Sequence, residues 1–260
     1  MTYRFKTNEF NFEYIESEIS NQVLWEKHCH AQFEMIAVSE GDISIMLEDK
    51  SYRLKENQAI IIPPLCYHSI TVNGCGAYHR VTVLFDIFAI PEALQSKLIK
   101  NGTNVTITTS SLIEKLKEVC LKNDSAFYAP LAQSLMIQVF YDAIKSEKNS
   151  EEPETDEFLK EIILYIDHHL HEKILLDDLA KHVSRSKSSV CHLFEEKMNI
   201  SPKQYILQKK LALASKLISE GIPPTIAAMR LGYENYSNFY RLYLKHFGKS
   251  PAKKRYYRYS

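Results

Sequence analysis

Hydrophobic and polar residues change their spacing along this chain, and the change divides it into parts. Between residues 10 and 90, short runs rich in β-branched and aromatic residues alternate with turn residues. This pattern predicts closely spaced strands of an antiparallel sandwich or barrel. Apolar residues then recur at helical intervals over 111–122 and 131–145, and helical patterns fill the chain after residue 157. The expected fold class is α+β multidomain: an antiparallel β-barrel with two following helices, then an all-α region.

A polar segment separates the two parts. Residues 146–156 (SEKNSEEPETD) contain no apolar residue, five acids and one proline, which is the composition of an exposed linker. We therefore expect one domain over residues 1–147, a linker over 148–156 and a second domain over 157–260.

The net charge of the whole chain is zero, but its two halves differ. Residues 157–260 contain 18 lysines and arginines against 10 acids, whereas residues 1–156 contain 14 against 22. Such a division favours a polyanionic partner for the basic half. Chance segregation of solvated surface charge is the other interpretation.

An internal repeat organises the basic half. Residues 193–205 (LFEEKMNISPKQY) align with residues 242–254, within the segment 242–255 (LYLKHFGKSPAKKR), at an offset of 49. Upstream, residues 179–183 align with residues 227–231 at an offset of 48. A repeat of this length with two short helices and a sharp turn predicts a helix-turn-helix unit present twice.

The last predicted helix, from about residue 236, has two different sides. One side is mainly aromatic and is expected to be buried, and the other carries polar and basic groups without a carboxylate. The polar side suits the major groove of DNA, where Asn and Arg read base edges and Lys contacts phosphate. The first side consists of Phe239, Leu242, Tyr243, His246 and Phe247, and the second of Ser237, Asn238, Arg241 and Lys245.

These segments resemble the DNA-binding domain of the AraC/XylS family of bacterial transcription regulators, from about residue 160 to 255. The most specific match is a Gly-aromatic pair followed by Phe239, Arg241, Tyr243, Gly248, Ser250, Pro251 and Arg255. The resemblance implies two recognition helices, held on one face of a DNA duplex by a long helix around 205–219. His192 and Lys210 stand where the family usually has arginine. The implied DNA-facing residues are Lys187, Ser188, Cys191 and His192 in the first unit and Tyr236, Ser237, Asn238, Arg241 and Lys245 in the second.

The acidic half contains a second motif. His28, His30, Glu34 and Gly41 follow the spacing His-x-His-x3-Glu-x6-Gly, and His68 ends a partial second motif. This spacing resembles the cupin signature, and AraC-type regulators commonly carry a cupin-like sensor domain. The resemblance therefore implies an effector-binding and dimerisation domain over the predicted barrel and its two helices.

Three interpretations of these polar residues are open. His28, His30, Glu34 and His68 could ligate a divalent metal such as Zn, Fe, Ni or Mn. They could instead line an effector pocket at the barrel mouth, with Trp25 and Tyr67 as its walls. The third interpretation is that they are structural hydrogen-bonding residues. The sequence does not establish a cofactor. The spacing of these three histidines and the glutamate is compatible with a divalent metal.

The combined features predict a ligand-responsive, sequence-specific DNA-binding regulator and not an enzyme. By family analogy we expect an activator that works with RNA polymerase, a small-molecule effector such as a sugar, and a homodimer formed through the helices of 111–145. A metal-dependent cupin enzyme fused to a DNA-binding module is the alternative. Five scattered cysteines, no secretory signal and no apolar run of membrane-spanning length indicate a cytoplasmic protein without a membrane partner.

Overall fold

The computed structural model of the protein divides into two compact units. One contains residues 1–27 and 32–153, and the other contains residues 154–260 together with the short segment 28–31. Residues 148–155 of the predicted linker, and Arg255, lie outside the described residues. The structure describes residues 1–20, 25, 27–100, 104–107, 110–122, 124–145 and 156–251.

The N-terminal unit is built on two antiparallel sheets, so the expected β-rich domain is confirmed. The larger sheet has the strand order β1-β2-β8-β3-β6-β9, and the smaller has the order β5-β4-β7. The strands are β1 (Thr2–Lys6), β2 (Phe10–Ile19), β3 (Phe33–Glu40), β4 (Asp42–Leu47), β5 (Lys50–Lys55), β6 (Gln58–Ile62), β7 (His68–Val72), β8 (Gly76–Phe85) and β9 (Asn104–Ile107).

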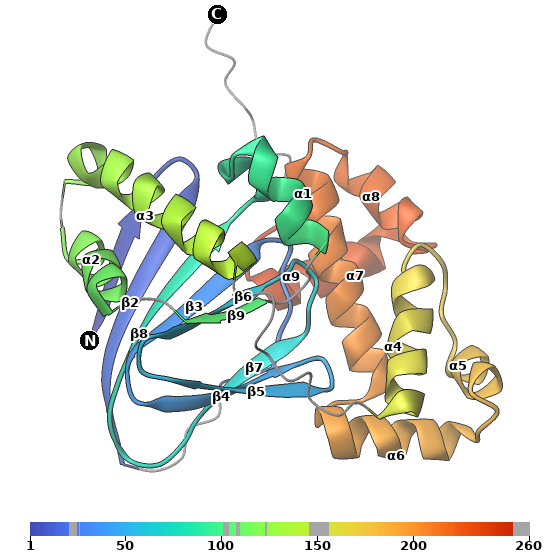
Figure 1. The fold of residues 1–260 in the computed structure, drawn as a ribbon. Helices are drawn as coiled ribbons and strands as arrows, with labels where there is room; N and C mark the ends of the chain where they lie inside the picture. The colour runs from blue at the N-terminus through green and yellow to red at the C-terminus, as the bar shows by residue number, and fades with distance from the viewer. Residues whose placement is uncertain are drawn as a thin grey trace, which may run out of the picture. The chain divides into compact units, whose positions relative to one another are not determined.

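The larger sheet is covered on both faces. Six consecutive residues of β3 are buried: Met35 and Ala37 belong to a core shared with helices, whereas Ile36 and Val38 belong to a core shared with the smaller sheet. Strand β4 of the smaller sheet instead alternates buried and half-buried residues. A strand enclosed on both faces has a continuous buried run, and a strand with one open face alternates. The N-terminal unit is therefore three layers thick: helices, large sheet and small sheet (Figure 1).

Helices α2 (Ser110–Cys120) and α3 (Ser125–Lys145) form the outer layer over the large sheet. Helix α3 begins earlier than predicted, and helix α1 (Glu92–Lys100), the 3-10 turn η1 (Ile87–Ala89) and strand β9 were not predicted. The two predicted helices thus complete the core of their own domain. The outward side of α3 still exposes the large apolar side chains Phe127, Leu131, Ile137 and Tyr141.

The C-terminal compact unit is all-α, and its helices confirm the predicted repeat of two helix-turn-helix units. Helices α5 and α8 have 7 residues each, α6 and α9 have 12 residues each, and the members of each pair begin at the predicted offsets. The turn inside each unit contains a residue with positive φ, Ser184 in the first and Gly232 in the second. The helices are α4 (Glu157–His168), α5 (Leu176–His182), α6 (Lys187–Met198), α7 (Pro202–Ser219), α8 (Pro224–Arg230) and α9 (Tyr236–Phe247).

Helix α7 joins the two helix-turn-helix units. It begins at Pro202, and Ser201 and Gln204 form a reciprocal capping box at its first turn, as the Ser-Pro pattern predicted. In the part of the chain that the structure describes, no helix is both long and apolar enough to cross a membrane.

Candidate DNA interface and effector site

Helix α9 presents its predicted polar stripe to solvent. The Asn235 side chain caps the helix by accepting hydrogen bonds from the backbone N–H groups of Ser237 and Asn238, at 2.8 and 3.3 Å. On the opposite side of α9, Phe239 and Tyr243 are buried in the core of the second helix-turn-helix unit. The α9 sequence contains no acid, so the stripe is uncompensated within the helix. All five predicted DNA-facing residues are exposed: Tyr236, Ser237, Asn238, Arg241 and Lys245.

One residue of α9 lies differently from the prediction. His246 was placed on the buried side, but it is exposed, whereas Leu242 and Phe247 beside it are half-buried. His246 lies after Lys245, close to the end of the helix, where the apolar side reaches the surface. The helical period assigns a residue to a side, and only packing decides how far the core extends along that side.

Helix α6 presents the corresponding stripe of the first helix-turn-helix unit. The Ser186 hydroxyl caps it by accepting a hydrogen bond from the Ser189 backbone N–H at 3.1 Å. Val190, Phe194 and Met198 hold its inner side. The predicted residues Lys187, Ser188 and His192 are exposed, and Cys191 is half-buried.

Acids accompany the basic groups of α6. The Lys187 Nζ lies 2.7 Å from an Asp177 carboxylate oxygen, and the His192 Nδ1 lies 3.6 Å from a Glu196 oxygen. Each of these two predicted DNA-facing residues therefore has a carboxylate beside it. Helix α6 has the same length as α9, but carboxylates lie beside its basic groups, whereas α9 contains no acid.

A buried lysine links the two helix-turn-helix units of the C-terminal region. The Lys210 ammonium on α7 donates hydrogen bonds to the backbone carbonyl oxygens of Glu172 and Leu231, the latter at 2.7 Å. Glu172 precedes the first unit, and Leu231 lies in the turn of the second. Burial lowers the pKa of Lys210, and the Glu172 charge opposes that shift. The sequence singled out Lys210 only as a substitute for the family's arginine; its place between two carbonyls was not predicted.

The close packing of Glu172 against the turn of the second helix-turn-helix unit also explains why Gly232 is a glycine. A Cβ on Gly232 would lie 2.8 Å from the carbonyl carbon of Glu172, and the φ of Gly232 is +74°. Glycine is therefore required here by both conformation and close approach. Beside it, Lys173 forms an ion pair with Glu234 at 3.1 Å, and Lys209 pairs with Asp167 at 2.9 Å.

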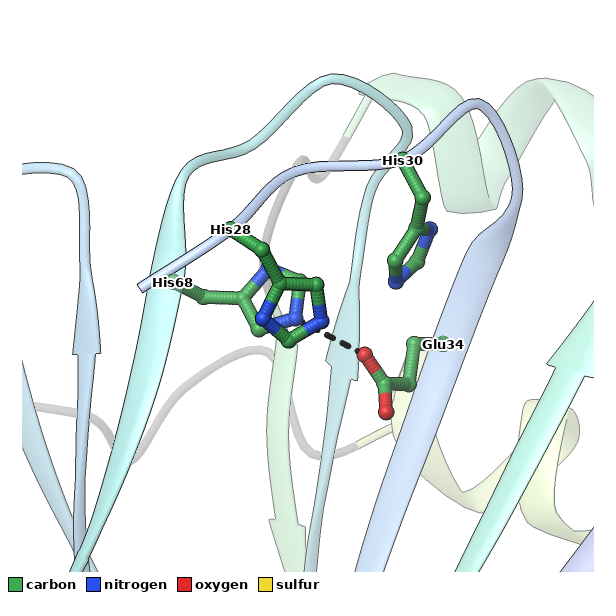
Figure 2. Close-up of side chains that lie close together, drawn as sticks. All are labelled: His28, His30, Glu34 and His68. Carbon is green, nitrogen blue, oxygen red and sulfur yellow. Dashed lines mark ion pairs between the residues drawn. The ribbon is translucent and has the colours of Figure 1, made fainter. Parts of the chain in front are cut away.

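The second candidate site is a cluster of three histidines and one glutamate. His28 and His30 lie in the segment before β3, Glu34 lies on β3, and His68 begins β7. Figure 2 shows the four side chains pointing toward one another. One ligand atom from each lies within 4.8 Å of the others. The sequence motif thus predicted residues that the fold brings together.

His68 has a polar contact at each of its two ring nitrogens. Its Nε2 lies 2.9 Å from a Glu34 carboxylate oxygen, and its Nδ1 donates to the Cys66 carbonyl oxygen at 2.9 Å. Burial lowers the pKa of His68, but the hydrogen bond and charge of Glu34 outweigh burial and leave the pKa raised. A histidine whose Nδ1–H is held by a carbonyl turns Nε2 toward a cation site.

The donor set fits a divalent transition metal. Three imidazoles and one carboxylate are typical ligands for such ions, which bind nitrogen at about 2.0–2.1 Å in the case of zinc. Ligand atoms within 4.8 Å of one another are close enough for one ion to join after a small contraction.

The two aromatic residues predicted as pocket walls lie in different surroundings. Tyr67 is buried, and its backbone N–H donates to a Glu48 carboxylate oxygen at 2.9 Å. Trp25 is half-buried and packs against Tyr78, with ring centroids 5.6 Å apart. Arg80, which the sequence reasoning missed, lies over the Trp25 ring at 4.8 Å. The available signal was the polar alternation of Tyr78, Arg80 and Thr82 in a strand.

Comparison with known families divides the chain in the same order as the fold. Residues 9–165 match the family model of the AraC-like ligand binding domain. Residues 179–256 match that of a helix-turn-helix domain.

Individual relatives cover most of the chain. An uncharacterized HTH-type transcriptional regulator, YdiP of Escherichia coli (strain K12), is 26% identical over 90% of this chain and 82% of its own length. The melibiose operon regulatory protein of the same organism is 20% identical over 88% of this chain and 82% of its own length. Among solved structures, an apo point variant of ToxT from Vibrio cholerae strain SCE256 has a TM-score of 0.48 and 10% identity, covering 95% of this chain and 97% of that chain.

Proposed function

The chain belongs to the AraC family of transcriptional regulators, and from that premise we propose how its two units divide the work. The C-terminal unit binds promoter DNA through α6 and α9. The N-terminal unit binds a small-molecule effector, forms a homodimer and biases the protein between states that differ in DNA affinity.

The exposed stripe of α9, which has no acid in its helix, is the observation that carries this proposal. Asn238 and Arg241 have the donor and acceptor groups that read base edges in the major groove, and Lys245 supplies a phosphate contact. Helix α6 contributes a second, weaker contact. Helix α7 has 18 residues and is therefore about 27 Å long, which suits neighbouring groove entries about 34 Å apart.

The dimer interface is assigned to α3. Phe127, Leu131, Ile137 and Tyr141 remain exposed on it although its other side completes the core. Exposed apolar groups along one helix are the usual material of a helix–helix interface between subunits. We expect the dimer to act in the cytoplasm and, as an activator, to contact RNA polymerase.

The effector site is assigned to the β-rich domain, and His28, His30, Glu34 and His68 are assigned as a divalent-metal centre. The likeness to a melibiose operon regulatory protein supports a sugar or a related metabolite as the effector. A bound ion would supply a Lewis-acid contact for an effector oxygen. The hydrogen bond from His68 to the Cys66 carbonyl oxygen would keep the His68 ring oriented toward the ion.

A footprint of the full-length protein on the DNA upstream of its own coding region tests the DNA assignment. Two protected elements about one helical turn apart are expected, on one face of the duplex. Equal affinity for that DNA and for a scrambled duplex, across a range of salt concentrations, would contradict sequence-specific binding.

Metal analysis of the same preparation tests the cluster and the alternative function together. One tightly held metal per chain, lost in His68→Ala, supports the metal centre. Turnover of a candidate substrate by the metal-loaded protein would favour a cupin enzyme over a sensor. If the protein contains no metal and still binds its promoter, the regulator function is retained. The metal centre and the metal-dependent enzyme are then both rejected.

A further inference from the structure

Strand β8 has a buried polar face inside the N-terminal unit. Its residues alternate between the two cores: Val81 and Val83 lie in the core under the helices, and Tyr78 lies in the core between the sheets. Arg80 and Thr82 share the side of Tyr78, because successive side chains of a strand point to opposite faces. They are only 7% and 9% exposed. The residues directly opposite Arg80 in the sheet, Ile15 of β2 and Val38 of β3, are both aliphatic.

The guanidinium of Arg80 is incompletely satisfied. Its Nη1 donates to the Tyr78 hydroxyl at 3.3 Å, and its charge lies over the rings of Trp25, at 4.8 Å, and Tyr78, at 5.9 Å. Its Nε is buried without a hydrogen-bond partner, and so is the Thr82 hydroxyl oxygen. Among the residues that the structure describes, no carboxylate forms an ion pair with Arg80. Glu34 and Glu13 also face this side of the large sheet, but His68 and Arg4 engage their carboxylates.

Burying a guanidinium without a counter-charge destabilises a fold, and an unsatisfied buried donor adds to the cost. A protein that keeps such a group usually gains function from it, because a ligand can supply the missing charge. Cation–π contacts with Trp25 and Tyr78 offset part of the cost and fix the plane of the guanidinium. The unused donors are then oriented in advance for an anion.

We propose that Arg80 binds the carboxylate of a small organic anion, such as a sugar acid, and that this anion is the effector of the regulator. The planar fork of arginine matches a carboxylate, the Thr82 hydroxyl supplies a second polar contact, and the Trp25 ring forms a wall for the body of the molecule. One guanidinium balances one carboxylate, whereas a phosphate dianion would bring an excess charge toward Glu34. The proposal deepens the proposed effector site and rests on the sensor function of that unit.

Trp25 makes the site directly observable, because it is the only tryptophan of the chain. The experiment measures quenching of Trp25 fluorescence in the full-length protein by iodide, an anion, and by acrylamide, which is neutral. Ionic strength is held constant with potassium fluoride. At low concentration, iodide should quench the wild type about threefold more strongly than Arg80→Gln, with saturation, because the guanidinium concentrates the anion beside the ring. Acrylamide should quench both proteins equally.

Competition identifies the anion. Acetate should relieve iodide quenching in the wild type, and acetamide, its neutral counterpart, should not. Stronger relief by inorganic phosphate than by acetate would overturn the carboxylate assignment. Linear iodide quenching of equal strength in the wild type and in Arg80→Gln would overturn the anion site altogether.

Thermal melting separates a binding role from a structural one. If Arg80 serves a ligand, Arg80→Gln should melt at the same or a higher temperature than the wild type without ligand. A large fall in melting temperature, together with stronger acrylamide quenching, would mean that Arg80 supports the fold, and would overturn the proposal. Thr82→Val should keep the iodide effect and weaken relief by acetate. Promoter binding by the wild type is measured separately, so failure of the anion site is distinguishable from failure of the regulator function.

Discussion

The two helix-turn-helix units share one backbone plan and differ in their charge. Helices α6 and α9 have equal lengths, each has a polar side-chain cap at its start, and each ends at a left-handed residue, Asn199 or Gly248. On α6, however, Lys187 and His192 lie near carboxylates, whereas α9 has no acid. Caps and turns thus set the repeat, and the exposed charges decide how strongly each copy can hold DNA. We expect α9 to dominate sequence reading and α6 to adjust position.

The largest effect is expected at the seam that holds the two units together. Lys210→Met leaves the buried carbonyl oxygens of Glu172 and Leu231 without their donor, which should lower the free energy of unfolding by about 2–4 kcal/mol. Denaturant unfolding of the full-length protein measures the change. Binding should also become tolerant of one extra base pair between the two DNA elements, because their spacing is no longer fixed.

Two variants control the seam prediction. Lys210→Arg should restore most of the stability and the spacing requirement, because arginine also donates to carbonyl oxygens. Lys203→Met removes an exposed lysine from the same helix and should change neither. If Lys210→Met kept the wild-type spacing requirement, the two units would be held together by other contacts.

The next effect concerns the turn that distinguishes the second unit from the first. Gly232→Ala combines a positive φ with a clash against Glu172 and should cost about 1–3 kcal/mol of folding free energy. Gly221→Ala is the matched control, because Gly221 also has a positive φ but open space around its Cβ position. Unfolding curves of the two variants separate the clash from the backbone strain, and equal losses would rule out the close approach.

The third prediction compares the recognition helices directly. Arg241→Ala should weaken binding to the preferred DNA by about 1–3 kcal/mol and relax discrimination at one base position. His192→Ala should cost less, because Glu196 already lies beside His192. Titrations against a set of single-base variants measure both. A larger loss of discrimination for His192→Ala would reverse the assignment of the dominant helix.

The smallest effect is a gain of affinity in the first unit. Asp177→Asn releases Lys187 from its ion pair and should tighten DNA binding by up to about 1 kcal/mol, the range of an exposed salt bridge. Glu195→Gln removes the same charge from an exposed position of α6 and serves as the control. Equal gains in affinity titrations would indicate a general charge effect with no special part for Lys187.

The sequence determined the elements with local signatures. The Ser-Pro pair fixed the start of α7 because a hydroxyl cap and a proline act within one turn, and the offset repeat fixed the paired helices because both copies carry the same signals. The resemblance to the cupin motif singled out His28, His30, Glu34 and His68 together, and the fold brings them close to one another. The role of the cluster stays a prediction. Homodimerisation through α3 and the DNA contacts themselves stay predictions.

Only the tertiary structure decided which faces are covered and what lies across from them. The alternation of β8 separates Tyr78, Arg80 and Thr82 from its valines, but the same alternation suits a strand whose polar face meets water. The smaller sheet covers that face, so Arg80 is buried. Lys210 likewise became a connector only because two carbonyls distant in sequence meet its ammonium. Local patterns report the period of an element, whereas burial and pairing depend on segments far along the chain.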